Sequence, residues 1–437
     1  METNTWKNGD FTYRDHVLNL PWDHQNPDNG LGTLEVFARE VVRDGGEKLP
    51  YLVFFQGGPG CASPRPINPE GGWLGRLLKD YRVLLLDQRG TGASTPLAAP
   101  QINALGNIEQ QLQYLRLLRT DQIVADAEAF RAELCPDEKW TLFGQSYGGF
   151  CITTYLSYYP QAIERVLLTG GTPALDTSAD DIYRLTYDKL RFRHEQFNRR
   201  FPETEAMIRR VCAHLEDHEE LLPTGERLSA RRLRTVGINL GRDTGFMHLR
   251  LMFENPFTTL GGTTRLRPDF LAQVGGEVSM ARTPLYALMH ETIYAGATPA
   301  LEGQATNWAA HRISREVAGF AEDANPLAKD EPFFLTGEHI YPWMFEEDPA
   351  LTPLAEVANA LAQYTNWPPL YLPQQLAANQ IPGAAAIYFD DIFVPVEPSL
   401  KWVKTAGIER YVTSKYQHSG IGTAGAEILG QLLELSR

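Results

Sequence analysis

The stretch that most constrains the fold of this chain is residues 142–150, which read Leu-Phe-Gly-Gln-Ser-Tyr-Gly-Gly-Phe. It ends a short apolar run and leads into a segment compatible with a helix. Glycines two residues before and two residues after Ser146 leave room for a sharp strand-to-helix turn that holds the serine hydroxyl above a sheet. Because glycine and serine are common, an ordinary surface turn fits the same five residues. The rest of the chain has to decide between the two interpretations.

Short, continuous apolar runs flank this stretch on both sides. They lie at residues 51–55, 81–86, 140–143 and 165–169. Runs of this length indicate strands buried on both faces, which is typical of a parallel sheet. Helical patterns such as residues 121–134 alternate with them, so we predict an open, doubly wound α/β sheet with its function at the carboxyl ends of the strands. An alternating run at residues 34–40 predicts a further strand at an antiparallel edge.

The composition of the chain changes after about residue 172, where charged and aromatic residues become frequent and helical patterns replace the buried-strand runs. Helical patterns occur at residues 180–201, 285–294 and 307–317. Strand patterns return at 384–389 and 410–413, before a C-terminal helix from about residue 424. We therefore predict an α/β core formed by residues 1–172 and 361–437, with residues 173–360 inserted as a helical lid, which we call the cap.

Composition narrows the classes of partner. The 437 residues carry 40 basic and 54 acidic side chains, a net charge of −14, and no long basic run. This balance disfavours nucleic acids and anionic membranes as partners. The N-terminus has no apolar signal core, and no stretch approaches the roughly 18 apolar residues of a membrane span. The cysteines form neither a Cys-x-x-Cys pair nor a metal-binding spacing: Cys61, Cys135, Cys151 and Cys212. We expect a cytoplasmic protein without a metal or another cofactor.

A serine that transfers an acyl group needs a base to take its proton and a carboxylate to orient that base. In α/β-hydrolases these groups follow one another in the order serine, acid, histidine. His418 follows the last predicted strand and precedes Ser419-Gly420, so it is the candidate base. Asp390 and Asp391 both follow the preceding strand. Neighbouring residues in an extended segment point to opposite sides, so at most one of them faces the histidine.

The reaction also needs two hydrogen-bond donors for the oxyanion. The loop Gly57–Gly60 follows the first apolar strand, and its glycines let a backbone N–H approach a substrate oxygen. We expect one donor from this loop, at Gly58, and the other from the N–H of Tyr147, directly after the serine. A tight structural turn is the alternative interpretation of the glycines.

Three core motifs together resemble the prolyl aminopeptidases, also called proline iminopeptidases, which are serine peptidases of the α/β-hydrolase fold. The motifs are Gly-Gly-Pro-Gly at 57–60, Asp-Gln-Arg-Gly-Thr-Gly-Ala-Ser at 87–94 and Gly-Gln-Ser-Tyr-Gly-Gly at 144–149. The resemblance extends into the cap, where stretches similar to those of the larger members lie at 289–294, 307–312 and 337–345. Gln56 stands where many members carry histidine, so a role for that histidine does not carry over.

The resemblance implies a function and a set of site residues. Ser146 is the nucleophile, His418 the base and Asp391 its orienting acid, because Pro395 follows Asp391 at the family's interval. The family removes an N-terminal residue, preferably proline, from small peptides through an acyl-enzyme intermediate. The resemblance also implies cap carboxylates that bind the free amino terminus, Glu291 and Glu338, and aromatic residues that wall a pocket for the pyrrolidine ring: Tyr294, Tyr341, Trp343 and Phe345. Taken without the resemblance, these are ordinary surface glutamates and core aromatics.

Two other functions remain open from the sequence. The core motifs specify acyl transfer but not the acyl group, so an esterase or an aminopeptidase of broader preference fits them as well. A hydrolase-fold protein that binds a ligand without catalysis is the alternative from a different class. It would need no intact serine, acid and histidine, whereas all three are present here in the expected order.

Overall fold

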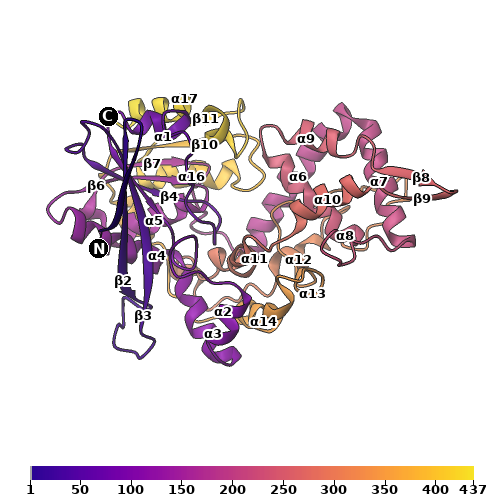
Figure 1. Ribbon diagram of the computed structural model, residues 1–437, viewed down its shortest axis with the longest axis horizontal. Coiled ribbons are helices and arrows are strands. Elements are labelled where there is room, and N and C mark those ends of the chain that lie inside the picture. Colours follow the sequence, from indigo (N-terminus) through magenta and orange to yellow (C-terminus); the bar gives the residue numbers. More distant parts are fainter. Residues whose placement is uncertain (1) are drawn as a thin grey trace.

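The computed structural model describes residues 2–437, which form a nine-stranded sheet with helices on both faces and a further group of helices beside it (Figure 1). The strands follow the order β1-β2-β3-β5-β4-β6-β7-β10-β11. Their bounds are β1 Glu2–Asn8, β2 Phe11–Pro21, β3 Thr33–Arg43, β4 Tyr51–Phe55, β5 Arg82–Leu86, β6 Trp140–Gln145, β7 Ile163–Thr169, β10 Gly383–Tyr388 and β11 Glu409–Thr413. From β5 to β11 every neighbouring pair is parallel, whereas β1, β2 and β3 pair antiparallel. The predicted mostly parallel α/β sheet is confirmed.

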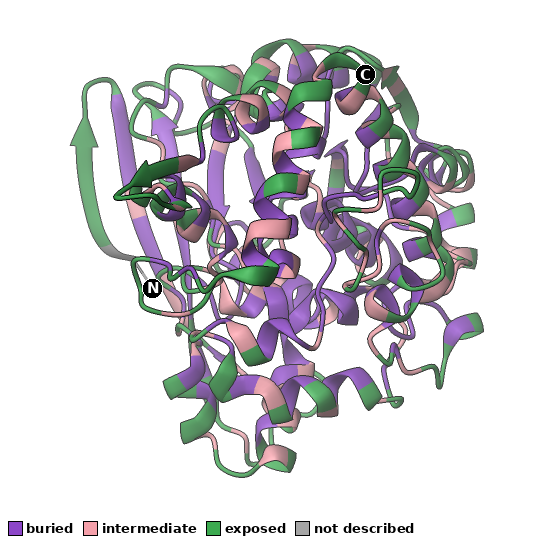
Figure 2. Ribbon diagram, turned by 90° about the vertical axis from the view of Figure 1, so that its right-hand side faces the viewer, coloured by how far each residue is buried: buried purple, intermediate pink, exposed green. Residues whose placement is uncertain are grey.

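Strand β4 shows why the apolar runs are continuous. Leu52 and Phe54 point into the core on one face of the sheet, and Val53 and Phe55 point into the core on the other. Both faces are covered, so a strand at the centre of the sheet has no polar side. Figure 2 shows the central strands in the colour of buried residues.

Helices cover the two faces of the sheet. One face packs against α1 (Gly72–Leu77) and α17 (Gly420–Leu435). The other packs against α4 (Thr120–Leu134), α5 (Tyr147–Tyr158) and α16 (Val396–Ala406). The remaining core helices are α2 Ala99–Ala104, α3 Ile108–Leu115 and α15 Pro373–Ala377.

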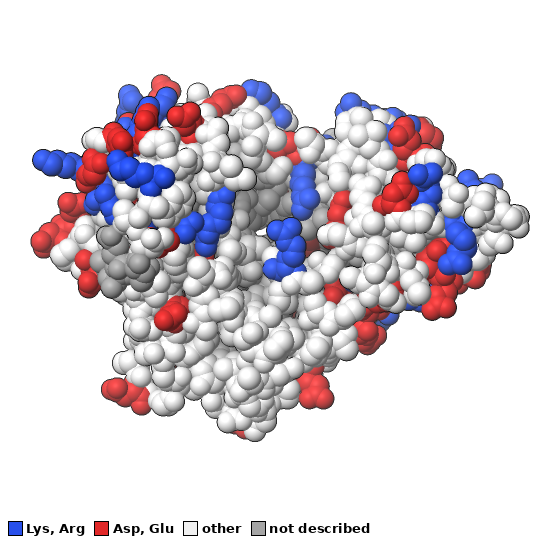
Figure 3. Space-filling view, viewed as in Figure 1, with Lys and Arg blue, Asp and Glu red and all other residues white. Residues whose placement is uncertain are grey.

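The cap helices stand beside the sheet, and the chain returns from them to add β10 and β11 (Figure 1). They are α6 Ala179–Arg200, α7 Pro202–Asp217, α8 Ala230–Arg234, α9 Gly245–Met252, α10 Pro268–Val278, α11 Pro284–Met289, α12 Ala309–Ser314, α13 Met344–Glu347 and α14 Ala355–Gln363. Two 3-10 helices of the cap matter below: η3 Thr235–Gly241 and η4 Glu291–Tyr294. Figure 3 shows the surface hollowed between the sheet and the cap. The division at residues 172 and 360 stays a prediction.

Some elements differ from the sequence-based expectation. The helix expected over residues 285–294 is α11 followed by η4, and the one expected over 307–317 is the shorter α12. The C-terminal helix starts at Gly420, earlier than expected, and its backbone angles are non-helical at Ala424, where the sequence placed the start. A hairpin of β8 (Phe257–Leu260) and β9 (Thr263–Leu266) was not expected, although a Gly-Gly turn with positive φ joins its strands.

Within residues 2–437, none of the helices combines the length and the apolar composition that crossing a membrane requires.

Candidate active site

Ser146 occupies a strained turn between β6 and α5. Its φ of 54° lies in the left-handed region, which residues other than glycine rarely adopt. The flanking glycines are required by close backbone contacts. A Cβ on Gly144 would lie 2.5 Å from the backbone of Gly148, and one on Gly148 would lie 1.9 Å from the carbonyl oxygen of Phe55. The Gly-x-Ser-x-Gly pattern therefore forms a sharp strand-to-helix turn and not a surface turn.

His418 and Asp391 meet at the carboxyl end of the sheet. Asp391 Oδ2 lies 2.7 Å from His418 Nδ1, and Asp391 Oδ1 accepts the N–H groups of Phe393 and Val394 at 2.8 Å and 3.0 Å. Burial of the imidazole opposes its protonation, but the charge and hydrogen bond of Asp391, together with the charges of Glu338 and Asp243, outweigh burial and raise the pKa of His418. Such a histidine can accept a proton from a serine and remain oriented by its carboxylate.

Ser146 and His418 line one cavity of about 210 Å³ between the sheet and the cap. Gly57 and Gly58 line it from the loop after β4. A Cβ on Gly57 would lie 3.1 Å from Ser146 Cβ, so this loop passes directly beside the serine. Tyr147 is the first residue of α5, and its N–H has no acceptor within the helix. The two expected oxyanion donors thus flank the serine.

Glu338 reaches the same cavity from the cap. Tyr286 lines the cavity beside it and donates its hydroxyl to Glu338 Oε2 at 3.2 Å, while His290 Nε2 lies 3.7 Å from Glu338 Oε1. The side chain of Glu338 is 16% exposed, so its carboxylate is mostly shielded from water but is not closed off.

Glu291 is buried and does not line this cavity, but it lies close to the same group of residues. Its Oε1 accepts the N–H of Ala310 at 2.9 Å, whereas its Oε2 is buried with no hydrogen-bond partner. Burial raises the pKa of the Glu291 carboxyl, against the lowering effect of the Ala310 N–H. The phenol of Tyr183 has a pKa raised first by burial and then by the charges of Glu291 and Glu338. Both carboxylates therefore act on one phenol.

The four predicted pocket aromatics separate into two groups. Tyr294 is half-buried and packs edge-on against Tyr183, with ring centres 5.6 Å apart. The other three pack inside the cap: Tyr341 bonds Tyr187 through its hydroxyl and stacks on Trp343, and Phe345 contacts Trp308. None of the four lines the cavity of Ser146, and these contacts favour a packing role for Tyr341, Trp343 and Phe345.

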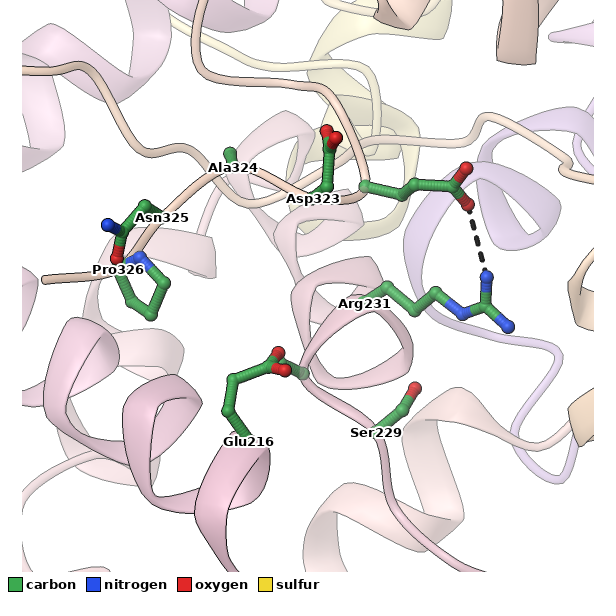
Figure 4. Close-up of a pocket in the computed structure, with 9 residues that line it drawn as sticks. Glu216, Ser229, Arg231, Asp323, Ala324, Asn325 and Pro326 are labelled. Carbon is green, nitrogen blue, oxygen red and sulfur yellow. Dashed lines mark hydrogen bonds and ion pairs between the residues drawn. The ribbon is translucent and has the colours of Figure 1, made fainter. Parts of the chain in front are cut away.

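A larger cavity, of about 460 Å³, lies on the far part of the cap (Figure 4). Arg231 and Glu322 form an ion pair at its wall, with 3.1 Å between the nitrogen and the oxygen. No residue predicted from the sequence to act in catalysis lines it. Size therefore does not identify the active site here, whereas the chemistry of the lining residues does.

Within residues 2–437, no group of three or more His, Cys, Asp or Glu side chains is arranged to hold a metal ion.

Comparison with known proteins decides the family. The family described as the alpha/beta hydrolase fold matches residues 50–209. A proline iminopeptidase from Aeromonas sobria is 41% identical over 425 residues, which cover 97% of this chain and 96% of that protein. The chain belongs to the proline iminopeptidase family. The resemblance expected from the motifs is thus confirmed, and the match includes the cap.

Two further relatives are less similar to this chain. Proline iminopeptidase aneH from Aspergillus aculeatus is 30% identical over 429 residues, covering 95% of this chain and 92% of that protein. Serine protease Hip1 from Mycobacterium bovis is 25% identical over 196 residues, covering 38% of this chain and 36% of that protein.

Several residues that line the cavity were not predicted from the sequence of this proline iminopeptidase family member. Tyr286, Ile238 and Arg242 line it from the cap, and Phe393 lines it from the loop of Asp391. Phe393 lies within the Asp390–Pro395 segment that the sequence singled out, so its proximity to the acid was a usable signal. The cap residues belong to no motif, and the sequence contains no local pattern that marks them.

Proposed function

We propose that this chain is a serine aminopeptidase that releases an N-terminal residue, preferably proline, from small peptides. Ser146 is the nucleophile, His418 the general base and Asp391 the residue that orients it. The observation that carries the proposal is the cavity shared by Ser146, His418 and the cap carboxylate Glu338. It combines the groups for acyl transfer with a negative charge for a substrate's amino terminus.

The first half of the reaction forms an acyl-enzyme. His418 takes the proton of the Ser146 hydroxyl as its oxygen attacks the carbonyl carbon of the N-terminal residue. The N–H groups of Gly58 and Tyr147 stabilise the oxyanion, and loss of one such donor typically lowers the rate by about 100 to 1000-fold. The imidazolium then returns the proton to the leaving amine, and Asp391 stabilises the positive ring in between.

In the second half, water replaces the leaving peptide. His418 removes a proton from the water, whose oxygen attacks the acyl carbon. The ester bond to the Ser146 oxygen then breaks, the imidazolium returns the proton to that oxygen, and the free amino acid leaves. Glycine at position 170 leaves room for the imidazole on this side, since a Cβ there would lie 3.1 Å from His418 Nδ1.

The cap carboxylates explain the requirement for a free amino terminus. A peptide that begins with proline carries a secondary ammonium group with two N–H donors. Glu338 lines the cavity and can accept one of these donors directly. Glu291 keeps one buried oxygen without a partner but lies outside the cavity lining, so it accepts the second donor only if the substrate reaches past that lining. Two consecutive residues near Glu291, Asn307 and Trp308, have positive φ, and strain of this kind clusters at functional sites.

A panel of substrates tests the proposal. We expect rapid hydrolysis of a proline arylamide, slower hydrolysis of alanine and leucine arylamides, and no hydrolysis of N-blocked proline arylamide. Ser146→Ala should abolish all of it while circular dichroism stays unchanged. Hydrolysis of a short-chain ester with every arylamide left intact would instead identify an esterase.

Variants of the glutamates separate binding from packing. Glu338→Gln and Glu291→Gln should raise KM or lower kcat/KM for the proline arylamide by about 10-fold or more, since charged hydrogen bonds contribute about 1.5–3 kcal/mol. The exposed cap residue Glu302 offers a matched control, and Glu302→Gln should behave like the wild type. An equal loss on a simple ester would contradict a role in binding the amino group.

We also propose a cytoplasmic location. All four cysteines are free thiols, and three of them are buried. Unpaired thiols suit a reducing compartment. Cell fractionation with an antibody against the chain tests this, and recovery outside the cytoplasmic fraction would contradict it.

A further inference from the structure

One cap residue, Asp243, contacts the loop of His418 on both sides of the histidine. Asp243 lies between η3 and α9, 174 and 176 positions from its partners in the chain. Its Oδ1 accepts the N–H of Gln417 at 2.8 Å, and its Oδ2 accepts the Ser419 hydroxyl at 2.8 Å. The N–H of Asp243 in turn donates to the Ser419 oxygen at 3.0 Å. Three hydrogen bonds thus join this one residue to the two neighbours of His418.

The hydroxyl of Ser419 does not cap the helix that it precedes. Ser419 is the N-cap residue of α17, where a serine side chain normally accepts a backbone N–H of the first helical turn. It makes no such bond here, and its hydroxyl bonds to Asp243 instead. Such a bond normally stabilises the first turn of a helix. The hydrogen bond between Ser419 and Asp243 of the cap takes the place of this capping bond.

The segment before Asp243 also touches the loop that carries the acid. A Cβ on Gly241 would lie 2.4 Å from the ring of Phe393, so only glycine permits this approach. Phe393 lies edge-on to the imidazole of His418, with ring centres 4.9 Å apart. The cap segment Gly241–Asp243 therefore packs against the loops of both Asp391 and His418.

The same segment is anchored within the cap. Arg242 donates to Asn239 Oδ1 at 2.9 Å, and the amide of Asn239 donates to Glu277 Oε2 in α10 at 2.7 Å. Asp243 is thus held at a defined position relative to the cap helices, and a rigid support of this kind can hold a reacting group in place.

We propose that Asp243 is a positioning residue, which holds the His418 loop from the cap so that the histidine is placed to act on Ser146. This inference rests on the proposed role of His418. The cap then acts in catalysis through the histidine loop as well as through substrate binding. Misplacement of a catalytic group by about 1 Å can lower the rate by about 100-fold.

Replacing the carboxylate tests the contact. Asp243→Asn keeps the size of the side chain but cannot accept with both terminal atoms. We expect kcat to fall by about 10 to 100-fold with KM within about twofold of the wild type. The rate at which a fluorophosphonate labels Ser146 should fall in parallel, because this reaction uses the serine and histidine but no amino terminus. Asp269→Asn is the matched control, since Asp269 is an exposed cap aspartate paired with Arg267.

The pH profile adds a readout that a purely structural role would not move. The negative groups acting on His418 are Asp391 from the core and Glu338 and Asp243 from the cap, and all three raise its pKa against burial. Removing the charge of Asp243 lowers this pKa. The acid limb of the labelling rate should therefore move to lower pH in Asp243→Asn and stay in place in Asp269→Asn.

A second variant keeps the test decisive if Asp243→Asn does not fold. Ser419→Ala removes the hydroxyl partner and leaves the carboxylate in place, and it should lower kcat and the labelling rate in the same direction. If both variants fold, the double variant should lose less than the product of the two single losses, because both remove one contact. Unchanged labelling rates in the folded variants would overturn the proposal.

The proposed function is judged separately, on the wild type and on His418→Ala. Absence of labelling at Ser146 in the wild type, or full labelling of His418→Ala, contradicts the triad itself. Normal behaviour of both, combined with full activity of Asp243→Asn and Ser419→Ala, contradicts only the role of Asp243.

Discussion

The carboxylate of Asp391 accepts three hydrogen bonds, one of them from His418 Nδ1 at 2.7 Å. The carboxylate is completely buried, so backbone N–H groups and the imidazole replace the water that would otherwise solvate its charge. Both oxygens are occupied, which fixes the plane of the carboxylate and with it the orientation of the ring. The neighbouring Asp390 is only half-buried and makes no such contact with His418.

The first prediction compares these two neighbours. Asp391→Asn should lower kcat on the proline arylamide by about 10³ to 10⁴-fold, because an amide favours the wrong tautomer of the histidine and cannot stabilise the imidazolium. Asp390→Asn should stay within about twofold of the wild type. Steady-state kinetics on both variants checks this, and a large loss in Asp390→Asn would reassign the acid.

The second prediction concerns pH. The pKa of His418 is raised, and only the neutral ring can act as base, so activity should rise with pH through a value above about 6.5. The carboxyl of Glu291 also has a raised pKa and could contribute to the same limb in peptide hydrolysis. Labelling of Ser146 by a fluorophosphonate involves no amino group, so the same acid limb in both reactions assigns it to His418. A limb below 6.5 in the labelling reaction would contradict the prediction.

The third prediction links function to stability. The carboxyl of Glu291 is buried with one oxygen unpartnered, and its raised pKa means that folding favours the neutral form over the charged one. The stability contributed by this group is therefore complete below the unfolded-state pKa and is lost as pH rises through the folded-state value. Glu291→Gln should raise the free energy of unfolding at neutral pH by about 1 kcal/mol while activity on the proline arylamide falls.

Chemical denaturation at two pH values checks this third prediction. The gain in Glu291→Gln should be larger at pH 8 than at pH 4, whereas the exposed control Glu302→Gln should show no difference. A loss of stability in Glu291→Gln at pH 8 would mean that the carboxylate is needed for packing.

The parts of the site that the sequence predicted are those defined by a local backbone pattern. Ser146 could be found because close backbone contacts require glycines at fixed offsets. The choice between Asp390 and Asp391 depended on resemblance, since alternation along an extended segment limits the pair to one residue without naming it. Tyr286 and Asp243 could not be found, because their partners lie 52 and 174 positions away. Contacts between the cap and the core depend on how these two parts pack together, and the spacing of residues within a short segment does not predict that packing.

The last prediction concerns one such docking contact. Leu285 of α11 is buried against two glycine-rich loops of the core. A Cβ on Gly60 would lie 2.6 Å from Leu285 Cβ, and a Cβ on Gly90 would lie 2.8 Å from Leu285 Cδ1. Both glycines have positive φ, so each loop is shaped around the leucine. Gly60 and Gly58 belong to the same loop, so Leu285 packs against the loop of the expected oxyanion donor.

Leu285→Ala should leave a cavity at this contact and lower the free energy of unfolding by about 2–5 kcal/mol. If the leucine supports the donor loop, kcat should fall as well, with little change in KM, because the oxyanion interaction develops in the transition state. Leu327→Ala is the control, since Leu327 is 70% exposed in the cap. Denaturation and kinetics are measured on the same samples. A variant that loses stability but keeps its full kcat would show that the loop holds its shape without the cap leucine.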